Sequence, residues 1–221
     1  LKQYKNIKII AKKTKKFSGK YRLPKIKIIA GEKRKETLHR ENNCIFKLDI
    51  EKCYFTPRLS NERLRISKLV KNNESILVLG SGIGVYPLVI SKNSKAKEIY
   101  GMEINPVAHK YALENIKLNK TYNVTLLKGD AKKLILKLNK KFDRIIIPIP
   151  KNASLYLKSI LKVSKKNTII HFYDFSKEQE IPKSSIKKIK KHIKNFKVLR
   201  YAKCGQSSPR IYRVCIDFKL S

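Results

Sequence analysis

A glycine-rich turn between two short strands, followed by an acid about 20 residues later, limits most strongly what this chain can fold into. The apolar run Ser75–Leu79 leads into Gly80-Ser-Gly-Ile-Gly84, and a second run, Glu98–Glu103, ends in an acid. Glycine lets the backbone pass close to a ligand, and an acid at this place can accept hydrogen bonds from both ribose hydroxyls. The segment therefore predicts a nucleotide-cofactor pocket.

The spacing of the glycines separates two classes of cofactor. A dinucleotide fingerprint requires glycine at position 85, where the chain has Val85. Gly-x-Gly-x-Gly is instead the pattern of S-adenosylmethionine-dependent methyltransferases, and a further strand, Val124–Lys128, leads to Asp130, which suits the adenine amino group. The alternative is a tight strand-to-helix turn with two solvated acids. We predict S-adenosylmethionine as the cofactor, held by Gly80, Ser81, Gly82, Gly84, Glu103, Ile104, Asn105 and Asp130.

The chain is strongly basic, with 53 Lys and Arg against 16 Asp and Glu and a formal net charge of +37. Such a protein repels itself unless it meets polyanions, and the usual intracellular polyanion is nucleic acid. Part of the lysine excess could instead reflect an AT-rich genome. Since no stretch of about 18 apolar residues and no signal peptide is present, we expect no membrane segment and a cytoplasmic protein.

Cysteine and histidine are too scattered for a metal site. Cys44, Cys53, Cys204 and Cys215 form no Cys-x-x-Cys pair, and no histidine lies at zinc-ligand spacing. We predict no metal and unpaired buried thiols, although Cys204 and Cys215 could face each other across a hairpin. His171, at the end of a strand, is predicted to be structural.

From Glu74 onward, short β-branched runs alternate with amphipathic stretches, which is typical of a doubly wound parallel sheet. Strands are expected near 75–80, 98–103, 123–127, 142–148 and 167–173, with a closing hairpin at 196–201 and 212–218 that includes an antiparallel last strand. Helices are expected at 61–70, 106–118 and 183–194. In the helix at 106–118, Asn105 is the cap candidate and Pro106 occupies the first helical position.

Residues 1–58 differ from the rest in being lysine-rich, with short strands expected at 7–10, 26–30 and 45–50. Turn signals occur at Ser18-Gly19 and Gly31-Glu32. We predict a small basic β-rich (α+β) domain at 1–58 that contacts RNA, a linking helix at 59–73, and an S-adenosylmethionine-binding domain at 74–221.

Several ordered motifs run over almost the whole chain. They are Phe17-Ser-Gly-Lys-Tyr-Arg22, Cys53-Tyr-Phe-Thr-Pro-Arg58-Leu-Ser-Asn-Glu62-Arg63, Met102-Glu103-Ile-Asn-Pro, Glu114-Asn-Ile-Lys-Leu-Asn, and Ser208-Pro-Arg-Ile-Tyr-Arg-Val-Cys-Ile-Asp217. Together they resemble the archaeal and eukaryotic tRNA (guanine-37 N1)-methyltransferases. The resemblance implies a Rossmann-like class I methyltransferase sheet and the anticodon stem-loop of tRNA as partner, and we expect a monomer. It does not include the additional N-terminal domain with which larger members touch the outer corner of tRNA.

The resemblance also implies two catalytic residues. N1 of guanine carries a proton at neutral pH, so methylation requires a base, and charge moving toward O6 requires a cation or donor. The family's proposed base falls on Glu62, and the arginine that stabilises O6 falls on Arg22. Without the resemblance, Glu62 would be a first-turn helix acid and Arg22 a solvated cation.

Further roles carry over from the same family. Arg58 is the candidate partner of the cofactor carboxylate, and substrate contacts are expected at Arg63 and at Arg210, a candidate for phosphate. Tyr54 could stack near the cofactor or the target base, or could equally be a core aromatic between the two domains.

One departure from the family lies after the fourth strand, where relatives carry Asn-Leu-Pro. Here the chain has Pro148-Ile-Pro150-Lys151-Asn152. Proline offers no donor, so Asn152 or backbone carbonyls would have to hold the base. The change leaves room for the related aminocarboxypropyl transferase of wybutosine synthesis, and a non-catalytic basic RNA-binding protein is the alternative from another class.

Overall fold

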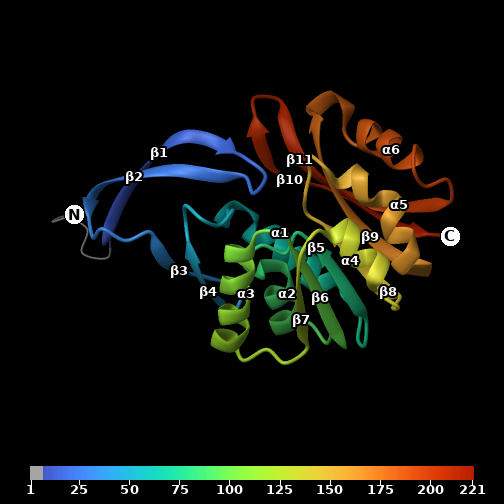
Figure 1. Cartoon of the computed structure of the whole chain (residues 1–221). Coiled ribbons are helices and arrows are strands. Elements are labelled where there is room, and N and C mark those ends of the chain that lie inside the picture. The colour runs from blue at the N-terminus through green and yellow to red at the C-terminus, as the bar shows by residue number, and fades with distance from the viewer. Residues whose placement is uncertain (1–6) are drawn as a thin grey trace.

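The computed structural model of the chain describes residues 7–221, which form one large sheet preceded by two small ones (Figure 1). The large sheet has seven strands in the order β10-β11-β9-β8-β5-β6-β7. Their bounds are β5 Ser75–Leu79, β6 Glu98–Glu103, β7 Val124–Lys128, β8 Phe142–Ile147, β9 Ser164–Lys177, β10 Phe196–Ser208 and β11 Ile211–Leu220.

Strand β5 lies inside this sheet, parallel to both of its neighbours β6 and β8. The strands β7 and β9 continue the parallel arrangement outward, and β11 runs antiparallel between β9 and β10. This order confirms the predicted Rossmann-like sheet with its antiparallel last strand. Because the chain leaves β5 on one side for β6 and returns on the other side as β8, a crevice is expected at the carboxyl end of β5.

Helices cover both faces of the sheet. Their bounds are α1 Ser60–Leu69, α2 Val85–Asn93, α3 Pro106–Asn119, α4 Ala131–Lys137, α5 Leu157–Ile160 and α6 Lys183–Lys190, with 3-10 turns η1 Pro57–Leu59, η2 Ala153–Tyr156, η3 Leu161–Val163 and η4 Glu178–Glu180. The expected cap of α3 is confirmed, since Asn105 Oδ1 accepts a hydrogen bond of 3.0 Å from the Val107 amide.

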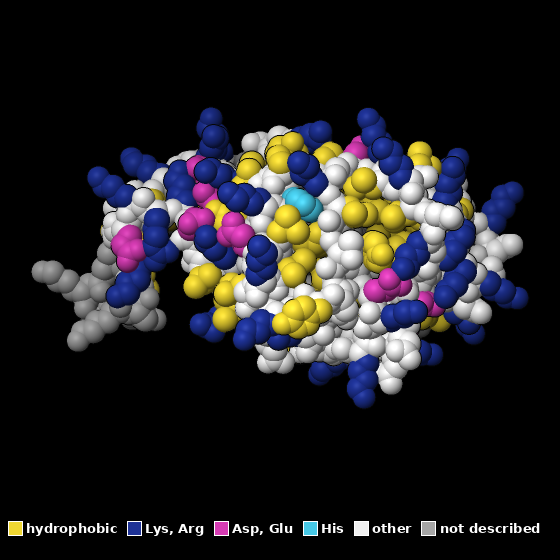
Figure 2. Space-filling model, turned by 60° about the horizontal axis from the view of Figure 1, so that its bottom comes forward, with side chains coloured by type: hydrophobic (Ala, Val, Ile, Leu, Met, Phe, Trp, Pro, Cys, Tyr) yellow, Lys and Arg dark blue, Asp and Glu magenta, His cyan; other side chains and the backbone are white. Residues whose placement is uncertain are grey.

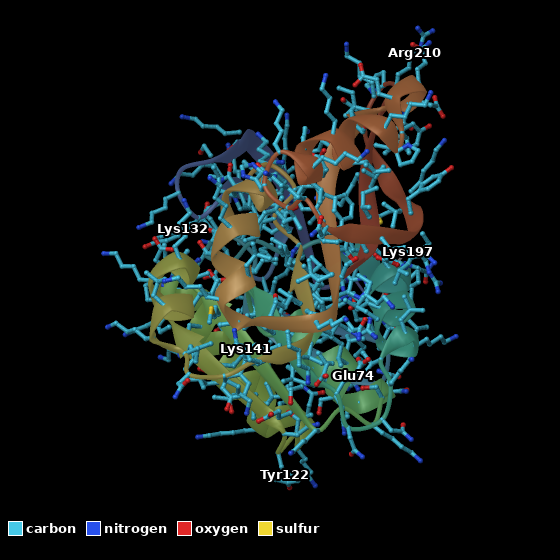
Figure 3. The ribbon with its side chains drawn as sticks, turned by 90° about the vertical axis from the view of Figure 1, so that its right-hand side faces the viewer. Glu74, Tyr122, Lys132, Lys141, Lys197 and Arg210 are labelled. Carbon is cyan, nitrogen blue, oxygen red and sulfur yellow. The ribbon has the colours of Figure 1, made fainter. Side chains whose placement is uncertain are left out.

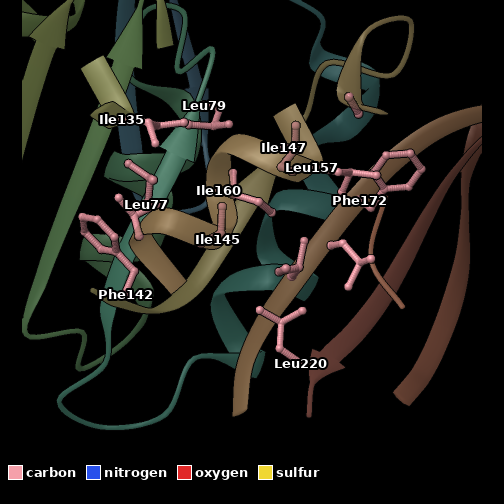
Figure 4. Packing of buried hydrophobic residues seen from close by; sticks show 14 of the residues in the cluster. Leu77, Leu79, Ile135, Phe142, Ile145, Ile147, Leu157, Ile160, Phe172 and Leu220 are labelled. Atoms are coloured by element: carbon pink, nitrogen blue, oxygen red, sulfur yellow. The ribbon is translucent and has the colours of Figure 1, made fainter. Parts of the chain in front are cut away.

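The alternation of side chains along β5 separates the two cores. Leu77 and Leu79 face a cluster that includes Ile135 of α4 and Ile160 of α5 (Figure 4). On the other face, Ile76 and Val78 pack in a cluster with residues of α1 and α2. Since each of these side chains is fully buried, each contributes about 1.5–3 kcal/mol to folding.

Two small antiparallel sheets precede the large one. The hairpin β1 (Ile9–Ser18) and β2 (Leu23–Gly31) extends to one side of the molecule (Figure 1). The pair β3 (Glu36–Glu41) and β4 (Cys44–Asp49) instead lies against α3. Phe46 and Leu48 of β4 are fully buried in one cluster with side chains of α2 and α3. The core of the large domain therefore includes β4, while the predicted boundary at residue 58 stays a prediction.

Amide side chains of α3 also bind the backbone of β4. Asn119 accepts from the Ile45 amide at 2.8 Å and donates to the Ile45 carbonyl at 2.7 Å. Asn115 does the same with Lys47, at 2.7 and 3.1 Å. The motif Glu114-Asn-Ile-Lys-Leu-Asn thus fastens the small sheet to the large domain.

The N-terminal expectations were right in the turns and incomplete in the strands. A hairpin turn does lie at Gly19, and near Gly31 the chain leaves β2 for the next small sheet, but β1 continues through a lysine-rich run to Ser18, and β3 was not expected at all. All four cysteines are free, as the sequence favoured.

On the face shown in Figure 2, Lys and Arg side chains are spread widely and outnumber those of Asp and Glu. None of the helices within residues 7–221 combines the length and apolar character that crossing a membrane requires.

Candidate active site

The loop after β5 is shaped by residues that leave room for a ligand. Gly80 has a φ of +63°, and a Cβ there would lie 2.9 Å from Ile149 Cδ1, so only glycine fits without strain. Ser81 is buried, and its Oγ has no hydrogen-bond partner among the residues that the structure describes. A buried hydroxyl without a partner is costly unless a ligand supplies one.

Glu103 ends β6 beside this loop. Its carboxylate accepts hydrogen bonds of 2.7 Å from both the Gly82 and the Asn105 amides. Burial raises the pKa of Glu103 in spite of these bonds. The glycine loop, Ile104 and Asn105 therefore lie around one acid, as the sequence predicts, and each oxygen of that acid keeps acceptor capacity for a ribose hydroxyl.

Asp130 lies at the end of the next strand, β7, where it caps α4 by accepting from the Lys132 amide at 2.9 Å. Tyr156 lies near both acids: burial, then the charges of Asp130 and Glu103, raise the pKa of its hydroxyl. Tyr156 belongs to a short turn after β8 without any motif, and no sequence pattern pointed to it.

The loop 148–152 continues β8 and reaches the glycine loop through the Ile149 contact with Gly80. Pro150 is buried, whereas Lys151 and Asn152 are exposed. The Asn152 side chain does not cap the following turn η2, so its amide is open to a ligand.

These residues fit the adenosine part of S-adenosylmethionine. The unpartnered Ser81 hydroxyl, the close approach at Gly80 and two acids at the ends of neighbouring strands are the groups that a nucleoside site requires. Gly80, Ser81, Gly82 and Gly84 would lie along the methionine part, Glu103 at the ribose and Asp130 at the adenine.

A cavity of about 580 Å³ lies between the β1–β2 hairpin, the 54–59 segment and the strands β9, β10 and β11. Three arginines line it, namely Arg22, Arg58 and Arg213. Its wall also contains the aromatic side chains of Phe17, Tyr54, Phe55 and Phe175. Cations beside aromatic faces suit a nucleotide, because guanidinium binds phosphate or base edges and a base stacks on the rings.

Tyr54 connects this cavity to the cofactor loop. Its ring packs edge-on against Phe17 with the centroids 5.2 Å apart, and the Arg22 guanidinium lies 4.9 Å from its centroid. Arg213 donates to the Tyr54 hydroxyl at 3.3 Å. The Tyr54 backbone oxygen lies 3.9 Å from where a Cβ on Gly82 would be. Tyr54 thus packs against the hairpin, and its backbone borders the cofactor loop.

Arg213 and Phe175 were not singled out from the sequence. The Arg213 guanidinium lies 5.5 Å from the Phe175 ring, and its Nε is buried with no hydrogen-bond partner within residues 7–221. Both residues come from strands whose apolar runs gave no sign of a cavity, although Arg213 belongs to the Ser208–Asp217 motif.

Glu62 lies behind the cavity wall and does not line it. Its carboxylate binds Arg65 through two hydrogen bonds of 2.7 and 2.8 Å and accepts a third, of 2.5 Å, from the Tyr173 hydroxyl. Cys204 lines the cavity next to it: burial, then the Glu62 charge, raise the pKa of the Cys204 thiol. Arg22 and Glu62 therefore lie on opposite sides of this wall.

Two predicted substrate residues have different surroundings. Arg63 is buried, and its guanidinium binds Glu41 and the Thr56 carbonyl, so in this structure it holds elements together instead of facing a ligand. Arg210 is exposed at the tip of the β10–β11 hairpin, where its side chain points into solvent (Figure 3).

Within residues 7–221, the structure brings one set of three possible metal ligands together, His171, Cys215 and Asp217. His171 bonds to Asp217 at 2.6 Å, and Cys215 donates to the same carboxylate at 3.2 Å. Arg65 and Arg144 also bind this set, at 2.6 Å to Asp217 and 2.8 Å to His171. Hydrogen bonds and two cations therefore account for the arrangement.

Comparison with known proteins identifies relatives over the whole chain. The model of the TRM5/TYW2 methyltransferase domain matches residues 37–199. The tRNA (guanine(37)-N(1))-methyltransferase Trm5b of Pyrococcus abyssi is 36% identical over 99% of this chain, which spans 66% of that protein. A tRNA (guanine(37)-N(1))/4-demethylwyosine(37)-methyltransferase, Taw22 of Nanoarchaeum equitans, is 34% identical over 100% of this chain and 91% of its own length.

A relative with another activity is also similar. The tRNA(Phe) (4-demethylwyosine(37)-C(7)) aminocarboxypropyltransferase of Methanocaldococcus jannaschii is 31% identical over 93% of this chain and 83% of its own length. Among solved structures, Pyrococcus abyssi Trm5b superposes with a TM-score of 0.88 at 34% identity, covering 100% of this chain and 66% of that one. Methanocaldococcus jannaschii TYW2 in complex with AdoMet has a TM-score of 0.77 at 28% identity, covering 89% of this chain and 91% of that one. Its bound ligand is the cofactor that the glycine spacing predicts.

Proposed function

Because this chain belongs to the TRM5/TYW2 methyltransferase family, which uses S-adenosylmethionine, we propose that it methylates N1 of guanine 37 in tRNA. One observation carries the proposal: Tyr54 borders the cofactor loop with its backbone and lines the aromatic, cationic cavity with its ring. A methyl donor and an acceptor base have to lie next to each other, and this residue joins the two sites.

The reaction requires a base at N1 and a positive group at O6. When bound, S-adenosylmethionine supplies an electrophilic methyl group. We assign the base to Glu62, because two hydrogen bonds with Arg65 fix its side chain and it lies next to Cys204, which lines the cavity. Arg22 lies in the cavity over Tyr54, where it would stabilise negative charge on O6.

Binding of tRNA would use the charged surface and the cavity together. The target base would leave its stack in the anticodon loop and enter between the hairpin and the large sheet. Arg213, at the cavity, and the exposed Arg210 would contact phosphates or the base, while Arg58, also at the cavity, would pair with the cofactor carboxylate. The proposal takes the monomer as the active unit.

A second activity has its own supporting observation. Pro148 stands where the resemblance implies asparagine, and the name of the aminocarboxypropyltransferase relative gives transfer of the other sulfonium substituent as its activity. In that case, the same cavity would present C7 of a modified guanine.

The test is incubation of the purified chain with S-adenosylmethionine and unmodified tRNA transcripts that carry guanosine or inosine at position 37, followed by nucleoside mass spectrometry. 1-Methylguanosine in the guanosine transcript supports the proposal. A transcript that already carries 4-demethylwyosine tests the alternative, which predicts an aminocarboxypropyl adduct. Binding of tRNA without either product would refute both activities.

A further inference from the structure

Behind the cavity wall, buried charged groups extend from Glu62 across the sheet in a continuous hydrogen-bonded chain. Arg65 binds Glu62 on one side and donates to Asp217 at 2.6 Å on the other. Asp217 Oδ1 lies 2.6 Å from His171 Nδ1, and His171 Nε2 lies 2.8 Å from Arg144 Nη1. Arg65 is partly exposed, and the other four residues are buried.

This hydrogen-bond network is attached to helix α1 at both ends of the helix. Arg144 forms two hydrogen bonds with Glu74, at 2.7 and 2.9 Å, and donates to the Leu69 carbonyl at 2.7 Å. Since Leu69 is the last residue of α1 and Glu62 lies in its first turn, the network holds the helix that carries the proposed base.

The donors and acceptors determine where the protons lie. A guanidinium can only donate, so His171 Nε2 must accept from Arg144 and carries no proton. His171 Nδ1 therefore carries the proton and donates it to Asp217. His171 is then neutral, which agrees with the lowering of its pKa by burial. Asp217 is thus an ionised carboxylate that accepts from both His171 and Arg65.

One cation, Arg65, is consequently shared by two carboxylates. When Glu62 takes up a proton, Arg65 keeps the charge of Asp217 as its partner. Without Asp217, protonation of Glu62 would leave a largely desolvated guanidinium without a counter-charge, which is strongly unfavourable. Asp217 and Glu62 therefore share the charge of Arg65, and loss of either carboxylate would leave the guanidinium to the other.

The other groups near Glu62 do not change charge in the same pH range. They are Tyr86, Tyr173, Cys204 and Cys215, and burial raises the pKa of each. Arg200, an exposed cation 3.8 Å from Asp217, stays charged throughout. Arg65 is thus the cation that binds the Glu62 carboxylate directly, and Asp217 is the second carboxylate that Arg65 binds.

We infer that Asp217 is a positioning residue that, through Arg65, orients Glu62 and sets its basicity. The inference rests on the proposed role of Glu62 as the base, and it adds a residue from the last strand, distant in sequence from α1, to that role.

The test is the single-turnover rate of methyl transfer between pH 5 and 9 for the wild type and for Asp217→Asn. Removing this negative charge leaves Arg65 to pair with Glu62 alone, so the acid limb of the rate profile should move to lower pH, and the more tightly paired carboxylate should lower the plateau about tenfold. Arg65→Gln should move the acid limb upward, and Arg65→Lys, which keeps the charge, should restore it.

Asp174→Asn is the matched control, because Asp174 is also buried on this sheet but pairs with Lys188 and Ser185. Its acid limb should match that of the wild type. Circular dichroism checks that each variant folds, and if Asp217→Asn does not fold, the opposite shift in Arg65→Gln and its reversal in Arg65→Lys decide the question. If the variants fold and are active but their acid limbs match that of the wild type, this inference is wrong and the proposed function stands. If the wild type transfers no methyl group, the proposed function is wrong as well.

Discussion

Arg63 and Glu41 form a buried ion pair through two hydrogen bonds of 2.5 Å, and this pair joins the end of β3 to the first turn of α1. Arg63 also donates to the Thr56 carbonyl at 3.2 Å. Since Thr56 belongs to the segment that lines the cavity, the pair holds one wall of the candidate site in place.

Loss of this pair should destabilise the fold. Glu41→Gln leaves the Arg63 guanidinium buried without a counter-charge, so the free energy of unfolding should fall by about 3–5 kcal/mol in urea denaturation. Glu32→Gln is the control, because Glu32 pairs with Arg34 on the surface and should change the value by at most about 1 kcal/mol. Equal losses in both variants would contradict the role of the pair.

Glu62→Gln should separate catalysis from binding. The amide cannot take the N1 proton, so the single-turnover rate should fall by about 10²–10⁴-fold. Affinities for cofactor and tRNA, measured by calorimetry and filter binding, should stay close to those of the wild type. An unchanged rate would exclude Glu62 as the base.

Glu103→Ala should weaken cofactor binding first. The change removes the proposed ribose acceptor and leaves the Gly82 and Asn105 amides without their partner, which should raise the Kd for S-adenosylmethionine by about 10–100-fold in calorimetry. Glu98→Gln, at the other end of the same strand, should leave the Kd unaltered, because Glu98 pairs with Lys140 and Ser75.

Folding stability should depend on pH through His171. Burial lowers the pKa of His171 in the folded protein, so below about pH 6.5 the unfolded chain binds a proton that the folded protein does not. The contribution of His171 to the free energy of unfolding is therefore complete above about pH 6.5 and is lost as the pH falls below it. Thermal unfolding between pH 8 and 5 should show this loss, of about 1 kcal/mol per pH unit. His171→Gln should make the unfolding free energy change less steeply with pH. His109→Gln is the control: it removes a partly buried histidine and should leave most of this pH dependence in place. Asp217, with its lowered pKa, contributes at lower pH, from about 4 downward.

Arg22→Ala should lower kcat/KM for tRNA through kcat. Its guanidinium lies at the cavity over Tyr54, and removing a donor to a developing oxyanion typically costs about 10²–10³-fold in rate. Lys20→Ala, in the same exposed turn, should change only the salt dependence of tRNA binding. If both variants lose only tRNA affinity, Arg22 binds phosphate and has no role at O6.

The large sheet was predictable because its strands repeat a local pattern, β-branched runs followed by amphipathic helices, that burial on both faces enforces. The hairpin was harder to predict. Residues 11–15, 17 and 18 are exposed, and the sequence of this run shows no apolar alternation, so β1 appeared too short. The strand β3 has an exposed Leu38 and charged neighbours and gave no signal for the same reason.

The candidate site, like the fold, has residues that the sequence predicted and residues that it did not. Gly80 and Glu103 lie within one strand-turn-strand unit, where spacing along the chain fixes spacing in space. Tyr156 and Arg213 come from separate segments that only the tertiary fold brings to the site. The burial of Arg63 was equally hidden, because its partner Glu41 lies on a strand that the pattern did not reveal.

The asparagine contacts of α3 have a further consequence for β4. A strand with an unpaired side is a template on which another chain can add a strand, and such addition leads to aggregation. Asn115 and Asn119 occupy the free amides and carbonyls of Ile45 and Lys47 as a neighbouring strand would. The helix thus gives this two-stranded sheet a protected side, and a strongly basic protein, for which we propose tRNA as the partner, keeps one fewer surface on which copies of itself could assemble.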